Sequence, residues 1–164
     1  MNDVVTAKDY GLLIAQRMDD VPEPMLHIWM PTFSAADHDG YTLSVGVIGS
    51  DFDADMVAQL VRVIREDRPH ILTLAASGYA TDTKVPNDGS PPTQIREWEA
   101  FSVVAITADE VATYMRTVER ISDGAVRFIG EWEPQDGTFT APWVSAVQDA
   151  LRQVRDAVVG RRDN

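Results

Sequence analysis

The most informative stretch of this chain is Ile71-Leu72-Thr73-Leu74-Ala75-Ala76, residues 71–76, because it is apolar at nearly every position. A half-buried strand alternates apolar and polar residues, whereas a strand covered on both faces is apolar throughout. A helix follows a different pattern, in which apolar residues recur every three or four positions. The stretch is also bounded by Pro69 on one side and by Gly78 on the other. We therefore predict a central β-strand over residues 71–76.

Further strands are predicted on both sides of this stretch. Apolar or alternating runs mark residues 25–30, 41–47, 98–107 and 125–133. The segment between the last two runs has two interpretations. Its β-branched residues and the turn signal Asp123-Gly124 favour a strand over residues 111–121, which would complete a three-stranded meander. A helix is the alternative, because Val111, Tyr114 and Val118 also fit helical spacing after a Thr107–Glu110 cap.

Three helices are predicted from apolar residues at helical spacing. The first follows a capping pair, Thr6 and Asp9, and ends before Pro22. The second follows residues 50–53 and stops before Pro69, and the third runs from Pro142 to Gly160. Together these elements predict one α+β domain over residues 1–164, with a mixed, mainly antiparallel sheet and about three helices packed on one face.

Residues 79–92 form the longest segment without periodicity, and they include three prolines. Loops of this length inside a domain are usually functional or disordered. Tyr79 and Lys84 are the side chains in this segment that we select as candidate binding residues.

Composition limits the classes of partner. The net charge of −12 disfavours binding to nucleic-acid phosphates and to anionic membranes, but it is compatible with a basic protein partner. The chain has no Cys, no apolar run long enough to span a bilayer and no signal-peptide pattern at its start. We therefore expect a cytoplasmic protein without a cofactor, and homo-oligomers are compatible with the sequence.

Acidic residues form one candidate metal site. Asp51, Asp53 and Asp55 alternate after a predicted strand, and alternating carboxylates can hold Mg²⁺ or Ca²⁺. Met56 stands where a calcium loop needs Gly, and Arg62 stands where it needs the bidentate Glu. We therefore prefer to interpret these aspartates as partners of a helix N-terminus. His38 is a further candidate metal ligand. It is a weak candidate, because the histidines of the chain do not have the spacing of metal ligands.

Two Glu-Trp-Glu triplets form the other acidic candidate. In a strand, each triplet places two carboxylates on one face and its Trp on the other. We prefer to interpret the four glutamates as a solvated sheet face, and a patch that binds a basic partner is the second choice. The binding candidates in the triplets are Glu97, Trp98, Glu99, Glu131, Trp132 and Glu133.

One resemblance rests on three short motifs: Arg68-Pro69-His70-Ile71-Leu72, Ser77-Gly78-Tyr79 and Trp98-Glu99-Ala100-Phe101. The chain resembles small uncharacterised proteins of actinobacteria and their phages. The resemblance covers the middle and the end of the chain, and it implies no activity, cofactor or catalytic residue.

No catalytic constellation emerges from the sequence, so we predict a non-enzymatic protein-interaction or accessory protein, compatible with a phage protein that acts on a host protein. One alternative is a structural subunit of an assembly such as a virion. Another alternative is a small metal-dependent hydrolase that uses Asp51, Asp53 and Asp55, or His38.

Overall fold

The computed structural model describes residues 6–20, 26–30, 41–45, 54–121, 126–135 and 142–162. Within these ranges the chain forms a six-stranded sheet of order β2-β1-β3-β4-β5-β6, in which every pair of neighbours is antiparallel. The strands are β1 (Leu26–Met30), β2 (Tyr41–Val45), β3 (Leu72–Lys84), β4 (Thr93–Ile106), β5 (Val111–Arg120) and β6 (Val126–Pro134). The helices are α1 (Ala7–Arg17), the 3₁₀ helix η1 (Met18–Asp20), α2 (Ala54–Asp67) and α3 (Pro142–Arg162).

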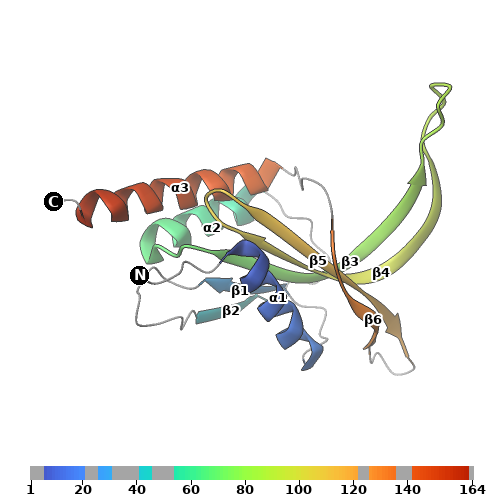
Figure 1. Ribbon diagram of the computed structural model, residues 1–164, viewed down its shortest axis with the longest axis horizontal. Coiled ribbons are helices and arrows are strands. Elements are labelled where there is room, and N and C mark those ends of the chain that lie inside the picture. The colour runs from blue at the N-terminus through green and yellow to red at the C-terminus, as the bar shows by residue number, and fades with distance from the viewer. Residues whose placement is uncertain are drawn as a thin grey trace.

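The inner halves of β3 and β4 form the centre of the sheet, as the apolar run at residues 71–76 predicts. Leu72 pairs with Ile106 and Leu74 pairs with Val104, and these side chains share one face. Helices α2 and α3 cover that face (Figure 1). The helical residues in this cluster are Leu60 and Ile64 of α2 and Val144, Val147, Ala150, Leu151 and Val154 of α3.

Helix α1 covers the opposite face of the sheet. Its residues Tyr10, Ile14 and Met18 pack in a second cluster with Phe101 and Val103 of β4 and with Tyr114 and Val118 of β5. The helix begins as its capping pair predicts, because the Thr6 side chain accepts a hydrogen bond from the Asp9 N–H at 3.1 Å. No described helix combines the length and the apolar composition that crossing a lipid bilayer requires.

The predicted α+β class, with three helices and a mainly antiparallel sheet, is confirmed. The sheet is not mixed among the described strands, because all neighbouring pairs are antiparallel. The expectation that the helices share one face needs correction, since α1 lies opposite α2 and α3. The physical reason lies in the central strands. Leu72 and Leu74 point to one face while Ile71 and Ala75 point to the other, so both faces need a cover.

Residues 111–120 are strand β5, which confirms the meander and makes the helical alternative wrong. The pair Thr107 and Glu110 does act as a cap, but of a turn between strands. The Thr107 hydroxyl accepts hydrogen bonds from the N–H groups of Asp109 and Glu110, and the Thr107 N–H donates to the Glu110 carbonyl. The Thr107–Glu110 contacts, which could also begin a helix, are therefore followed by a strand here, because pairing with β4 outweighs the helical spacing of the apolar residues.

Residues 79–92 are only partly a loop. β3 continues to Lys84 and β4 begins at Thr93, so the two strands extend well beyond the helices as one hairpin (Figure 1). The loop prediction failed for residues 79–84 because their side chains are largely exposed on both faces, which removes the apolar alternation that marks a strand in sequence. We call residues 78–98 the arm.

Candidate functional site

The arm is a two-stranded ribbon that projects from the body of the molecule (Figure 1). β1 pairs with β3 only at residues 73–75, and β5 pairs with β4 only at residues 100–106. Beyond those positions, β3 and β4 pair with each other alone among the described residues, as far as Lys84 and Thr93. Within the described part of the chain, both outer edges of the arm therefore lack a neighbouring strand, and such an edge is the usual template for adding a strand from another chain.

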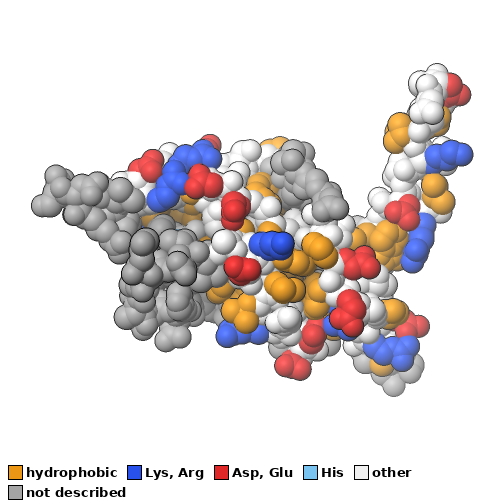
Figure 2. All heavy atoms as spheres, in the orientation of Figure 1, with side chains coloured by type: hydrophobic (Ala, Val, Ile, Leu, Met, Phe, Trp, Pro, Cys, Tyr) orange, Lys and Arg blue, Asp and Glu red, His pale blue; other side chains and the backbone are white. Residues whose placement is uncertain are grey.

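Large apolar side chains of the arm face the solvent. Tyr79 is 71% exposed, Val85 is 69% exposed and Ile95 is 66% exposed, the three highest values among the large hydrophobic residues that the structure describes. Figure 2 shows hydrophobic and charged side chains interspersed along the arm up to its tip. Of these three residues we selected only Tyr79 from the sequence. Ile95 gives a signal of its own, since it is an isolated apolar residue within a polar segment.

The tip of the arm is a structured turn. The Asp88 carboxylate accepts a hydrogen bond from the Ser90 N–H at 3.0 Å, and Gly89 adopts a left-handed conformation with φ of 82°. The hydrogen bonds from Ser90 hold the pKa of Asp88 below its ordinary value. An Asp side chain that bonds two residues onward stabilises a turn locally, so the tip needs no contact with the body to keep its shape.

The two faces of the arm carry different chemistry. On the face continuous with α2 and α3, the Arg96 guanidinium lies 4.6 Å from the centre of the Trp98 ring. On the other face, Glu99 holds Arg120 of β5 through two hydrogen bonds of 2.8 Å, and these bonds raise the pKa of Arg120. The ion pair ties the base of the arm to the body, and Tyr79 lies directly opposite Glu99 in the strand register.

The structure does not bring the glutamates of the two triplets together. Glu97 and Glu99 lie on the α1 side of the sheet, in alternation with Trp98 and in phase with Phe101. In β6 the phase is reversed. Trp132 packs on the α1 side, and Glu133 lies opposite Met115 on the other side.

Trp132 has a structural role on that side. Its ring lies 5.5 Å from that of Phe128, and its indole N–H donates a 2.8 Å hydrogen bond to Asp19. Arg116 donates to the same Asp19 oxygen at 2.6 Å. Asp19 therefore fastens η1 to β5 and β6, and Trp132 is engaged within its own chain.

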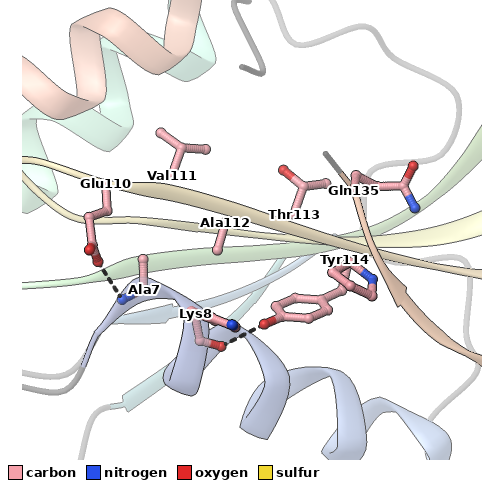
Figure 3. Close-up of a pocket in the computed structure, with 9 residues that line it drawn as sticks. Ala7, Lys8, Glu110, Val111, Ala112, Thr113, Tyr114 and Gln135 are labelled. Carbon is pink, nitrogen blue, oxygen red and sulfur yellow. Dashed lines mark hydrogen bonds between the residues drawn. The ribbon is translucent and has the colours of Figure 1, made fainter. Parts of the chain in front are cut away.

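A cavity of about 510 Å³ lies where the start of α1 meets β5 and the end of β6 (Figure 3). The polar groups that line it hold these elements together. Glu110 accepts a hydrogen bond from the Ala7 N–H at 3.3 Å, and the Tyr114 hydroxyl donates to the Lys8 carbonyl at 2.9 Å. Burial also raises the pKa of Tyr114. We interpret the cavity as a gap in the packing between α1 and the sheet.

The candidate metal ligands are only partly within the described residues. Asp51, Asp53 and His38 lie outside them. Asp55 lies exposed in the first turn of α2, as expected for an acidic residue at a helix N-terminus. The described ranges contain no group of three His, Asp or Glu side chains that could hold a metal ion.

Comparisons with known proteins add no functional assignment to this geometry. No protein-family model matches the chain, and neither a curated protein nor a solved structure matches it.

Proposed function

We propose that this protein is a non-enzymatic interaction protein that binds a partner protein through its arm. The observation that carries the proposal is the exposure of Tyr79, Val85 and Ile95 on a ribbon whose two edges are unpaired among the described residues. An isolated two-stranded hairpin is at best marginally stable in water. A third strand or a covering surface from a partner would stabilise it.

The composition of the arm fits protein binding. Tyr, Trp and Arg are the residue types that most often dominate the binding energy of protein interfaces. The arm supplies one of each, in Tyr79, Trp98 and Arg96. Full burial of one large apolar side chain contributes about 1.5–3 kcal/mol, so the three exposed apolar residues can drive a specific contact.

The arm is a better candidate than an acidic face, since the four triplet glutamates are divided between the two faces of the sheet. Glu99 is also engaged by Arg120. A basic partner that needs all four carboxylates at once has no surface to bind.

Site-specific photo-crosslinking tests the proposal. A photoreactive amino acid placed at Tyr79 or Ile95 should cross-link to a discrete protein partner in the native cell extract. The same probe at Gln153, an exposed position on α3, is the matched control. Equal labelling from Gln153, or no labelling from either arm position, would contradict binding through the arm.

A further inference from the structure

Among the described residues, the arm and the two end strands of the sheet, β2 and β6, have edges without a neighbouring strand, and two of these surfaces bear on the partner of the arm. One is the arm, and the other is the outer edge of β6, the last strand of the sheet order. Both are β-strand edges without a neighbour among the described residues. Each also carries an exposed isoleucine, Ile95 on the arm at 66% and Ile129 on β6 at 43%.

The two surfaces carry side chains of opposite charge, although the arm also has three carboxylates, Asp82, Asp88 and Glu97. Lys84 and Arg96 are the arm cations, and Glu131 and Glu133 are the β6 carboxylates. The ion pairs formed among the described residues involve none of these four side chains. Five arginines do have a carboxylate partner within the chain: Arg116, Arg120, Arg127, Arg152 and Arg155. Five further described cations are, like the arm cations, in none of these ion pairs: Lys8, Arg17, Arg62, Arg65 and Arg68.

The two surfaces do not meet within one copy of the chain. β5 lies between β4 and β6 in the sheet, and the arm and β6 diverge as they leave the body (Figure 1). Their side chains nevertheless match in phase. Arg96 and Glu133 both lie on the α2 and α3 side of their strands, so a continuous sheet in which the arm strand runs antiparallel to β6 would place them on the same face.

Charge also favours the arm over other parts of the molecule as the contact between copies. The chain carries a net charge of −12, so the bodies of two copies repel each other. Within the arm, Lys84 and Arg96 offset two of its three carboxylates. The arm is therefore nearly neutral, and its cations can approach the acidic body of a neighbour.

We infer that the partner of the arm is a second copy of this chain, and that the arm docks along the open edge of that copy's β6. Backbone hydrogen bonds between the strands supply the main contact, and the arm cations pair with the β6 carboxylates. The contact joins two different surfaces, so it closes either by reciprocal exchange between two copies or around a ring. This inference rests on the proposed function, because it names the partner of the arm.

Charge reversal with mutual rescue tests the inference on the purified full-length protein. The wild type should show a mass above that of one 18.1 kDa chain in light scattering, and the mass should rise with concentration. The variants K84E/R96E and E131R/E133R should each self-associate about tenfold more weakly, because attraction becomes repulsion. An equimolar mixture should restore association, since the reversed arm of one variant then meets the reversed β6 of the other.

Matched controls exclude an effect of net charge alone. R62E/R65E changes the net charge as K84E/R96E does, and D55R/E66R changes it as E131R/E133R does. All four control positions are exposed on α2. Both controls should associate like the wild type.

The inference is overturned by a wild type that stays monomeric at every concentration, by a mixture that fails to restore association, or by controls that weaken it equally. The proposed function is judged separately. A monomeric chain whose Tyr79 probe still cross-links a different protein overturns the second-copy inference and supports binding through the arm.

Discussion

The inner and outer halves of β3 and β4 belong to the same two strands but have opposite surroundings. Leu72 and Phe101, in the inner halves, are at most 2% exposed, whereas Tyr79 and Ile95, in the outer halves, are at least 66% exposed. The register that joins the strands runs through both halves, with one irregularity between Asp82 and Thr83. The inner halves therefore serve stability, and the outer halves leave a hairpin free to contact another molecule.

The largest expected difference between the halves comes from truncating one apolar side chain in each. Replacing Phe101 by Ala should lower the free energy of unfolding by about 3–5 kcal/mol, because it opens a cavity between α1 and the sheet. Replacing Ile95 by Ala should change it by less than about 0.5 kcal/mol, because that side chain is exposed. Urea denaturation measures both values. A similar loss for the two variants would mean that the arm is packed in solution.

The α1 face of the inner half is expected to tolerate little added volume. A Cβ at Gly11 would lie 3.1 Å from the Cβ of Ala105 and 3.1 Å from Cε2 of Tyr114. Ala has a better helix propensity than Gly, which should raise the free energy of unfolding by about 1 kcal/mol. Overpacking against Ala105 and Tyr114 should lower it by about 1–3 kcal/mol. Gly11→Ala should therefore destabilise the protein by up to about 2 kcal/mol in thermal or urea unfolding. A more stable variant would show that α1 can move away from the sheet.

Alkaline pH tests the same packing through ionisation. Burial raises the pKa of Tyr10 and of Tyr114 above the ordinary value of 10.0. The unfolded chain then releases these protons first as the pH rises, so the stability present below pH 10 is lost as the pH passes through the raised pKa values. The free energy of unfolding should therefore fall as the pH rises from about 9 through the unfolded value of 10.0 and on to the raised pKa values of the folded protein.

The double variant Tyr10→Phe/Tyr114→Phe should lose less stability over that pH range than the wild type. At neutral pH it should be less stable by about 0.5–1.5 kcal/mol, since Tyr114 no longer donates to the Lys8 carbonyl. Equal pH dependence in both proteins would show that neither phenol is buried in solution.

A small effect on stability is also expected from removing the whole arm. Tyr79 and Glu99 are paired, so residues 80–98 can be replaced by Asn-Gly, which closes a two-residue hairpin turn. The free energy of unfolding should change by less than about 1 kcal/mol, because the excised side chains are mostly exposed. The cross-linking partner and the self-association should both be lost. A large loss of stability would contradict the division between the two halves.

Most elements of the fold could be predicted from local sequence. The capping pair Thr6 and Asp9, the apolar run at residues 71–76 and the start of α3 at Pro142 all act within a few residues, so a single sequence shows them. Residues 79–84 could not be predicted as a strand, since their extended conformation depends on pairing with β4 rather than on their own pattern. Tyr79 and Lys84 could still be selected, because they lie in the longest aperiodic segment.

The sequence by itself determined where the three helices and most of the strands form, since hydrogen bonding and side-chain periodicity operate between near neighbours. Only the tertiary structure decided that α1 lies opposite α2 and α3, and that the two Glu-Trp-Glu triplets face opposite ways. The physical reason is strand register. A shift of one residue moves a side chain to the other face, and register depends on contacts between residues far apart in the chain.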